Sequence, residues 1–215
     1  MPRQTKKQIT ALKAVEALKQ KYPEAKCSLT ADTPFQLLVA TRLSAQCTDA
    51  RVNIVTPALF AALPTPKDFA EAPVEGIEIY IKSCGLYNTK ARDLKALGET
   101  LMLKYKGELP KTLEELIRLP GIGRKTANLI CGDVYGLPAV VADTHCIRIS
   151  ARLGLTATKD PKAVEMALRK ILPPEESNDF CHRIVLHGRD TCIARAPKCN
   201  ECVCQEFCPK ILKKL

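Results

Sequence analysis

Apolar residues along most of this chain recur at the spacing of an α-helix. Near the N-terminus they follow one another at steps of three and four, on one face of a helix: Ile9, Leu12, Val15, Leu18 and Tyr22. Residues 88–105 show a helical pattern, and so do residues 178–186. The segment 35–46, FQLLVATRLSAQ, is apolar on most sides, so we expect a buried helix there.

Local start and stop signals bound these helices. Thr33 to Gln36 and Thr112 to Glu115 have the spacing of a capping box, in which side chains satisfy the first backbone N–H groups. Proline is typical of the first position of a helix, and it follows Thr33, Thr65 and Asp160. The glycines expected to end helices are Gly85, Gly107 and Gly188.

Strand signals are nearly absent, because the run AVV at 139–141 is too short to predict a strand. The chain shows no internal repeat, and its one shift in composition falls at about residue 190, where cysteines accumulate. These patterns together predict an all-α fold.

Charge narrows the expected partners. Lys and Arg number 33 against 23 Asp and Glu, which gives a formal charge of +10. Such a protein is attracted to polyanions, to nucleic acid first and anionic membranes second. A basic surface that is merely solvated is the plainer alternative.

The cysteines indicate a reducing compartment. No segment approaches the about 18 consecutive apolar residues of a membrane span, and the N-terminus lacks the apolar run of a signal peptide. Eleven cysteines, an odd number, then favour reduced thiols over disulfides. We therefore expect a cytoplasmic protein whose cysteines bind metal or pack in the core.

The stretch LPGIGRKTA at 119–127 separates two predicted helices, which is the pattern of a helix-hairpin-helix over residues 112–131. It is not a Walker A loop, because an arginine separates the second glycine from the lysine and no strand precedes it. The glycines allow a tight turn, and the N-terminus of the second helix attracts phosphate. The residues expected at a DNA backbone are Gly121, Ile122, Gly123 and Arg124. Ile122 is expected to pack the hairpin rather than read bases, and a turn that binds nothing is the alternative.

Lys125 is unusual at this place. A helix N-terminus carries partial positive charge and Arg124 adds a full one, and both disfavour an ammonium group. A neutral lysine amine is a nucleophile suited to an aldehyde-like carbon. The alternative is a solvated lysine on a helix face.

A cluster of cysteines lies near the C-terminus, with the spacing Cys192-x6-Cys199-x2-Cys202-x5-Cys208 and Cys204 as an extra thiol. In a reducing compartment this pattern predicts a metal or an iron–sulfur cluster, and the spacing disfavours a zinc ribbon without excluding zinc. Two cations between the first two cysteines are candidates for contact with phosphates: Arg195 and Lys198.

Three of these segments together resemble the endonuclease III family of base-excision DNA glycosylases. LPGIGRKTA matches the helix-hairpin-helix of the family, VADTH at 141–145 matches its Asp-bearing stretch, and the cysteine spacing matches its 4Fe–4S loop. LHGRDTCIAR, LLVATRLSAQCTDARVN and IKSCGLYNTKA also look like family segments, so the likeness covers residues 30–208.

The resemblance implies two helical lobes with DNA in the groove between them. Residues 27–135 would form a central domain with the hairpin, and residues 1–26 plus 136–215 a second lobe with a 4Fe–4S loop at 192–208. The implied ligands of the 4Fe–4S cluster are Cys192, Cys199, Cys202 and Cys208.

The resemblance also implies a bifunctional glycosylase and AP lyase that removes oxidised or ring-saturated pyrimidines. The damaged nucleotide rotates out of the duplex, Lys125 attacks the sugar C1′ and forms a Schiff base, and β-elimination nicks the strand. Asp143 would assist as a base or as a stabilising charge, with a helix N-cap as its alternative. Gln46 and Leu86 match positions that fill the gap left by the nucleotide, although a leucine is more often a core residue.

The expected partner is double-stranded DNA with a damaged base or abasic site, bound by a monomer in the nucleoid and without a membrane. One alternative is a monofunctional glycosylase of the adenine-mispair type, a branch that lacks the hairpin lysine and usually carries a further C-terminal domain. Another is a metal-containing DNA-binding module without catalysis, against which Lys125 and Asp143 argue.

Overall fold

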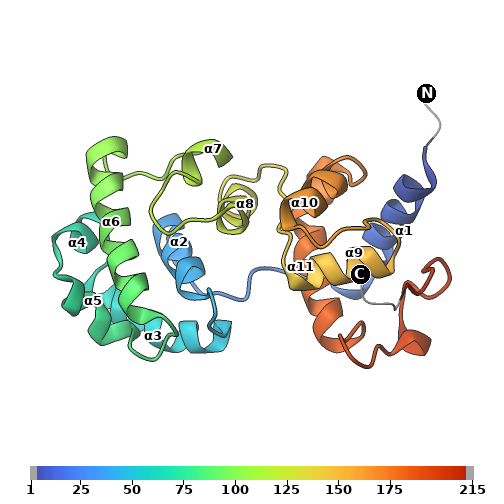
Figure 1. The fold of residues 1–215 in the computed structure, drawn as a ribbon, viewed down its shortest axis with the longest axis horizontal. Helices are drawn as coiled ribbons and strands as arrows, with labels where there is room; N and C mark the ends of the chain where they lie inside the picture. Colours follow the sequence, from blue (N-terminus) through green and yellow to red (C-terminus); the bar gives the residue numbers. More distant parts are fainter. Residues whose placement is uncertain (1–3, 212–215) are drawn as a thin grey trace. The chain divides into compact units, whose positions relative to one another are not determined.

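The computed structural model describes residues 4–211 and consists, over that range, of helices and connecting segments without a strand (Figure 1). The elements are α1 (Lys6–Lys21), α2 (Pro34–Leu43), α3 (Asp49–Ala62), α4 (Pro66–Glu71), α5 (Val74–Ile81), α6 (Tyr87–Tyr105), α7 (Leu113–Leu116), α8 (Arg124–Asp133), α9 (Thr144–Arg152), α10 (Pro161–Arg169), the 3-10 helix η1 (Pro174–Glu176), α11 (Ser177–Asp190) and the 3-10 helix η2 (Cys199–Glu201). The predicted all-α class is confirmed. No helix among these residues has both the length and the apolar character needed to cross a membrane.

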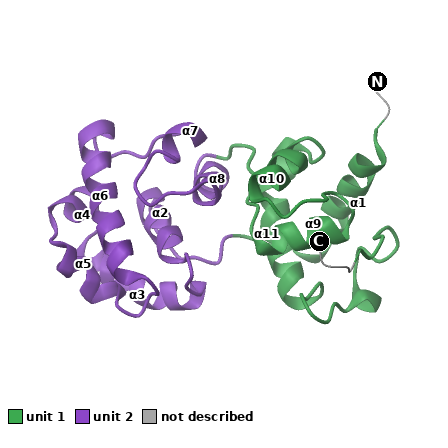
Figure 2. Ribbon diagram, in the orientation of Figure 1, with its two compact units in different colours: residues 1–26, 136–215 green, residues 27–135 purple. Residues whose placement is uncertain are grey.

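The chain divides into two compact units (Figure 2). Unit 1 consists of residues 1–26 and 136–215, and unit 2 of residues 27–135. Residues 1–3 and 212–215, which belong to the lobe expected from the sequence at 1–26 plus 136–215, lie outside the described residues.

In unit 2, α6 packs against both α4 and α5, while α2 packs against α3 and α8. The contact between α4 and α6 is so close that a Cβ at Gly98 would lie 2.6 Å from the carbonyl oxygen of Pro66. The core side chains that these helices bury include Leu38, Leu43, Leu59, Phe69, Ile77, Leu94 and Leu97. This core supports the hairpin formed by α7 and α8, which pack against each other.

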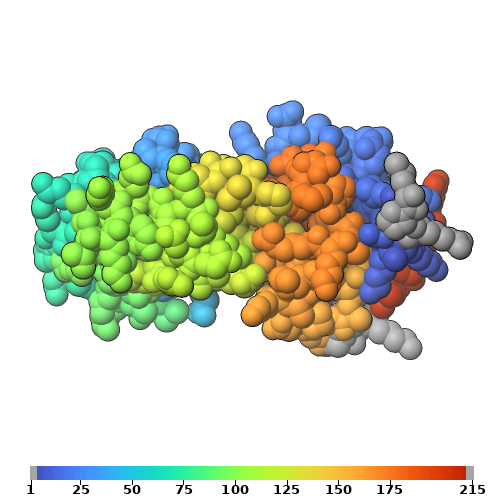
Figure 3. All heavy atoms as spheres, turned by 90° about the horizontal axis from the view of Figure 1, so that it is seen from above, coloured from blue at the N-terminus to red at the C-terminus, as the bar shows by residue number. Residues whose placement is uncertain are grey.

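In unit 1, α11 packs against both α1 and α9. The prediction that Gly188 ends this helix is wrong, because α11 continues to Asp190. A Cβ at Gly188 would meet the ring of His145 and would lie 2.8 Å from an amino nitrogen of Arg148. Glycine is therefore needed there for the close packing of α9 on α11. One face of α10 is buried, and its other residues form part of the surface in orange in Figure 3.

The predicted helix starts at Thr33, Thr65 and Asp160 are confirmed. Each of these side chains accepts a hydrogen bond from the backbone N–H three residues further on. At Thr33 the capping box is only half formed, because the Gln36 side chain accepts instead from the N–H of Asp32, at 2.9 Å. Local polar chemistry thus sets where these helices begin.

Two further predicted helix ends are wrong. α2 ends at Leu43 rather than continuing to residue 46, because the chain turns there and Gln46 has a φ of 54°. α5 ends at Ile81, so Gly85 does not end it; a Cβ at Gly85 would lie 3.1 Å from the carbonyl oxygen of Gln46. The sequence did not predict α3, in which Pro57 interrupts the helical pattern.

Candidate functional site

The hairpin is built around three apolar side chains. Leu116 is fully buried, and Leu119 and Ile122 are 3% and 5% exposed. The turn is closed by the N–H of Ile122, which donates to the carbonyl of Leu119 at 3.1 Å. The predicted packing role of the Ile122 side chain is therefore observed, and any contact from this residue to a ligand would come from its backbone.

The two hairpin glycines have different surroundings. Gly121 has a φ of 71°, and a Cβ there would lie 2.7 Å from Nε of Arg42 and 2.8 Å from Cβ of Asp93. Arg42 is held by Asp93, whose Oδ2 accepts from Nε at 3.0 Å and from Nη2 at 2.5 Å. Gly123 has a φ of −90° and, among the described residues, nothing within 4 Å of its Cβ position. The left-handed turn thus needs only Gly121, whereas Gly123 leaves space beside the backbone.

The N-terminus of α8 faces this open space. Gly123 is its N-cap, and no described side chain caps it, so its first N–H groups are suited to an anion. Arg124, half-buried, and Lys125, exposed, are its first two residues. Lys125 also acts on the half-buried Cys27: burial, the largest cause, raises the pKa of this thiol to about 11, and the positive charge of Lys125 is one of the influences that oppose the rise.

Gln46 and Leu86 share a rare backbone conformation. Their φ values are 54° and 59°, in the left-handed region that few residues other than glycine adopt. Leu86 is 57% exposed and Gln46 is exposed as well. The contact of Gly85 with the carbonyl of Gln46 places the two loops side by side. Leu86 is therefore not a core residue, and strain of this kind is typical of functional positions.

Asp143, in unit 1, is the N-cap of α9. Its Oδ1 accepts from the N–H of Cys146 at 2.7 Å, so the N-cap expected as one alternative is present. The preceding segment is held in the core, where the N–H of Val141 donates to Sγ of Cys181 at 3.3 Å. Asp143 itself is half-buried. The cap thus fixes the orientation of a carboxylate at the edge of unit 1.

The four predicted cysteine ligands line one small cavity of about 30 Å³ in unit 1. They share this lining with Arg152, Thr191, Pro197, Lys198 and Lys210. Cys204 is absent from the lining, and only 1% of it is exposed. The geometry therefore brings together the four thiols that the spacing selected: Cys192, Cys199, Cys202 and Cys208.

Hydrogen bonds reach the sulfur atoms of this cavity from several sides. Nη1 of Arg152 donates to Sγ of Cys192 at 3.3 Å, and the N–H groups of Cys204 and Lys210 donate to Cys202 and Cys208, each at 3.4 Å. Such donors stabilise negative charge on sulfur and tune a metal bound to it. The donor set therefore fits a thiolate-ligated metal.

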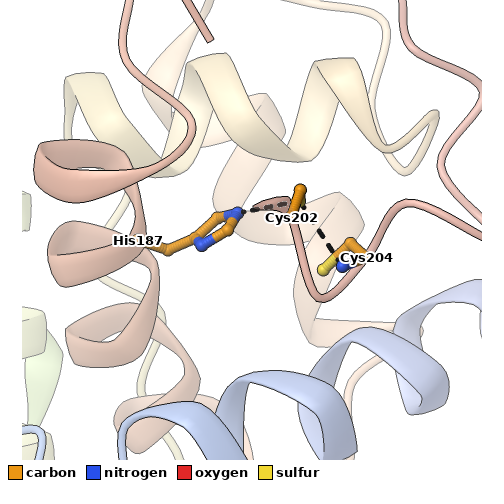
Figure 4. Close-up of side chains that lie close together, drawn as sticks. All are labelled: His187, Cys202 and Cys204. Carbon is orange, nitrogen blue, oxygen red and sulfur yellow. Dashed lines mark hydrogen bonds between the residues drawn. The ribbon is translucent and has the colours of Figure 1, made fainter. Parts of the chain in front are cut away.

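His187 is a neighbour of the cavity whose contact with Cys202 the sequence did not predict. It is 2% exposed, and its Nε2 lies 3.5 Å from Sγ of Cys202 (Figure 4). Its Nδ1 lies 3.3 Å from the hydroxyl of Tyr22, which donates to Asp190 at 2.7 Å. Because residues far apart in the sequence form this chain of hydrogen bonds, no local sequence motif predicts it.

The ligand atoms of His187, Cys202 and Cys204 also lie within 4.8 Å of one another, which gives a second possible ligand set. The hydrogen bond with the Cys204 side chain is the main cause that lowers the pKa of Cys202, to about 4, against the effect of burial. The same bond, with burial, raises the pKa of Cys204. Because Cys204 lies outside the lining of the cavity, the four cysteines that line it are the better candidate ligands. The two predicted phosphate contacts, Arg195 and Lys198, are exposed on the loop at 192–208 that carries these cysteines.

Comparison with known proteins gives consistent matches. The family model of HhH-GPD superfamily base excision DNA repair proteins matches residues 39–174. The endonuclease III of Synechocystis sp. is 46% identical over 193 residues, which cover 89% of this chain and 88% of the relative. That of Escherichia coli K12 is 39% identical over 197 residues, with 92% and 93% covered.

Solved structures agree with these relatives. The structure of a trapped endonuclease III–DNA covalent intermediate is similar with a TM-score of 0.88 and 42% identity, over 97% of both chains. A non-covalent endonuclease III–DNA complex gives the same values. The chain therefore belongs to the HhH-GPD superfamily of base excision DNA repair proteins and, within it, to the endonuclease III family of DNA glycosylases with AP lyase activity.

Proposed function

We propose that Lys125 is the nucleophile of this DNA glycosylase and AP lyase. The observation that carries the proposal is its place: an exposed lysine at the second position of α8, two residues after the open backbone of Gly123. A phosphate bound at the turn would bring a nucleotide within reach of this amine. The amine attacks C1′, the bond to the base breaks, and the sugar ring opens to a Schiff base. Loss of a proton from C2′ then expels the 3′ phosphate.

The hairpin is proposed to bind the DNA backbone through Gly121, Gly123 and the N–H groups that begin α8. The unfilled space beside Gly123 and the uncapped helix N-terminus support this. Arg124, Arg195 and Lys198 are proposed as further phosphate contacts, which would carry no sequence information. Binding at these residues would depend strongly on salt.

Asp143 is proposed to assist the chemistry at C1′. Its N-cap bond uses Oδ1, and the cap orients the carboxylate. The carboxylate would accept the proton of the lysine or stabilise positive charge that develops on the sugar. Asparagine preserves the cap and removes the charge, so Asp143→Asn separates the two roles of this residue.

Gln46 and Leu86 are proposed to fill the space that the extruded nucleotide leaves. An exposed leucine in a left-handed conformation, beside a loop that presents an amide, has the chemistry of a wedge between bases. The strained backbone of both residues supports a functional reason for their conformation.

A 4Fe–4S cluster is proposed as the group held by the four cavity cysteines. The spacing, the common cavity and the hydrogen bonds to sulfur support it. The cluster would tie residues 192–208 together, and the exposed Arg195 and Lys198 would then be presented to phosphates. The chemistry at C1′ requires nothing from it.

The proposed substrate is double-stranded DNA with an oxidised or ring-saturated pyrimidine, or with an abasic site, bound by a monomer. The DNA complexes among the similar structures support a DNA partner. We also propose a cytoplasmic, nucleoid-associated location, because the proposed substrate lies there.

Borohydride trapping tests the proposal. The parent protein, Lys125→Ala and Asp143→Asn are each incubated with a duplex that carries one thymine glycol, with and without borohydride. We expect a covalent adduct with the parent, none with Lys125→Ala, and a rate at least about 100-fold lower with Asp143→Asn. The two variants should retain the unfolding midpoint of the parent.

Other results of the trapping experiment would point to a different function. Release of the base by the parent without an adduct would indicate a monofunctional glycosylase. Neither release nor adduct on any lesion would indicate a binding module. An adduct with Lys125→Ala would contradict the role of this lysine.

A further inference from the structure

Unit 2 contains a pair of cysteines that the proposed chemistry does not use. Cys47 follows Gln46 and Cys84 precedes Gly85, so the pair lies where the two loops meet. Cys84 is 1% exposed and Cys47 is half-buried, and the neighbouring Cys47 is one of the causes, after burial, that raise the pKa of Cys84. Both are free thiols. Only one of the two sulfurs is thus open to a reagent from solvent.

A buried lysine stands beside this pair. Lys90 is fully buried, and its Nζ donates to the carbonyl of Leu43 at 2.8 Å. Burial lowers the pKa of Lys90, and its electrostatic interaction with Cys84 and Cys47 opposes this. A cation next to a thiol favours the thiolate, which is the form that oxidants attack.

We propose that Cys47 and Cys84 form a reversible disulfide when a hydroperoxide oxidises Cys47, and that this bond fixes the loops of Gln46 and Leu86 to each other. The contact between the two loops that carry these cysteines, the burial of Cys84 beside the half-buried Cys47, and the buried Lys90 carry this inference.

The chemistry proceeds in two balanced steps. The sulfur of Cys47 attacks one peroxide oxygen, the O–O bond breaks, and a sulfenic acid forms while the other oxygen leaves as water or, with an organic peroxide, as an alcohol. The sulfur of Cys84 then attacks that of Cys47, and the sulfenic oxygen leaves as water with the proton of Cys84. Two thiols are oxidised, and one peroxide is reduced.

The order of attack follows from the surroundings of Cys84. Burial, with the charge of Cys47 and the hydrogen bond to it, raises the pKa of Cys84 to about 11. Conversion of Cys47 to a neutral sulfenic acid removes the effect of its charge, so that burial alone is opposed by the positive charges of Lys90 and Arg51 and the pKa of Cys84 falls. Cys84 therefore becomes the better nucleophile only after Cys47 has reacted.

A consequence for activity rests on the proposed roles of Gln46 and Leu86. A disulfide brings its two sulfurs to about 2.0 Å, closer than two free thiols can approach, so it draws the loops together. Both loops carry residues in strained conformations that would have to enter DNA. We expect kcat/KM on lesion DNA to fall by at least about tenfold, since a misplacement of about 1 Å can cost up to about 100-fold.

A second pair in the chain provides a matched control. Cys146 and Cys181 in unit 1 are also neighbours, since Cys181 is the main cause that raises the pKa of Cys146, but they are 0% and 3% exposed. Because the proposal depends on access to one sulfur, this pair should remain reduced under conditions that join Cys47 to Cys84.

The test uses the full-length protein treated with hydrogen peroxide, then alkylated, digested with trypsin and analysed by mass spectrometry. The two cysteines lie in separate peptides with one cysteine each, LSAQCTDAR and SCGLYNTK. We expect these peptides to be joined after peroxide, separated again by dithiothreitol, and never joined in Cys47→Ser. In the parent, activity should fall with peroxide and recover with dithiothreitol, in parallel with the joining and separation of the peptides. Cys47→Ser should not show this change, so any loss of activity that it does show measures peroxide damage unrelated to the disulfide.

Several results would overturn the proposal. One is the absence of the joined peptides at peroxide levels that oxidise other half-buried thiols, and another is equally fast joining of Cys146 to Cys181. A joined pair with unchanged activity would refute the effect on the loops. Failure of the proposed function is distinguished from these results, because the reduced parent would then be inactive before any peroxide is added.

Discussion

The hairpin of unit 2 and the cysteine loop of unit 1 are both short irregular segments, but different interactions hold them. The hairpin buries three apolar side chains of its own. Of residues 192–208 in the cysteine loop, Cys204 alone is buried, and polar hydrogen bonds to sulfur and carbonyl groups hold the rest. The hairpin therefore has a core of its own, whereas the loop lacks one.

The hairpin and the cysteine loop therefore differ in whether they need a bound group to keep their conformation. Apolar packing and the Arg42–Asp93 ion pair maintain the hairpin without a ligand. The loop depends on the group that its thiols bind, because metal binding and folding are coupled in such segments. Four substitutions test this difference between the hairpin and the cysteine loop.

The largest effect is expected from Cys199→Ser, which removes one proposed ligand of the cluster. The loop should lose its order, and trypsin should cleave after Arg195 and Lys198 at least about tenfold faster than in the parent. Soluble yield and DNA affinity should fall as well. Limited proteolysis with peptide mapping checks this, and a parent-like pattern, yield and affinity would refute a structural role for the cluster.

Gly121→Ala should be the most damaging change within the hairpin. Alanine at a φ of 71° is strained, and its Cβ would displace the Arg42–Asp93 ion pair. We expect the free energy of unfolding to fall by about 2–4 kcal/mol. Urea denaturation measures it, and a loss below about 0.5 kcal/mol would show that the turn is not fixed by this packing.

Arg152→Gln should loosen the cysteine loop without removing a ligand. Nη1 and Nη2 of Arg152 donate to the carbonyls of Ile193 and Ala194 at 2.9 and 2.7 Å, and Nη1 also reaches Sγ of Cys192. Loss of these bonds should cost about 1–3 kcal/mol and speed the release of iron to a chelator. Iron release at the rate of the parent would mean that the cysteines alone determine the shape of the loop.

Gly123→Ala should have the smallest effect on stability, within about 0.5 kcal/mol, because its Cβ position is open among the described residues. The new methyl group would instead occupy the space proposed for a phosphate. We expect DNA affinity to fall by about tenfold, as measured by fluorescence anisotropy. Unchanged affinity would place the phosphate elsewhere.

The sequence could predict the features that local chemistry determines. The caps at Thr33 and Asp160 depend on residues three positions away, and the spacing of the cysteines indicated a shared site. The sequence could not predict contacts between distant residues. Close packing of α9 on α11 requires a glycine at position 188, and Gly85 lies against Gln46.

The same limit applies to the candidate site. His187 reaches Cys202, Arg152 reaches Cys192 and Cys47 meets Cys84 only because the fold brings these residues together. The sequence could not predict the left-handed conformations of Gln46 and Leu86 either, since neither residue type favours a positive φ.

The most direct test of the central claim is to locate the covalent bond in the borohydride-reduced adduct. Trypsin does not cleave after an alkylated lysine, so modification of Lys125 would leave it joined to the peptide that begins at Thr126. The predicted result is a single modified peptide that starts at Lys125 and carries the mass of the reduced sugar remnant. An adduct on another lysine or on the N-terminal amine, with Lys125 unmodified, would contradict the account.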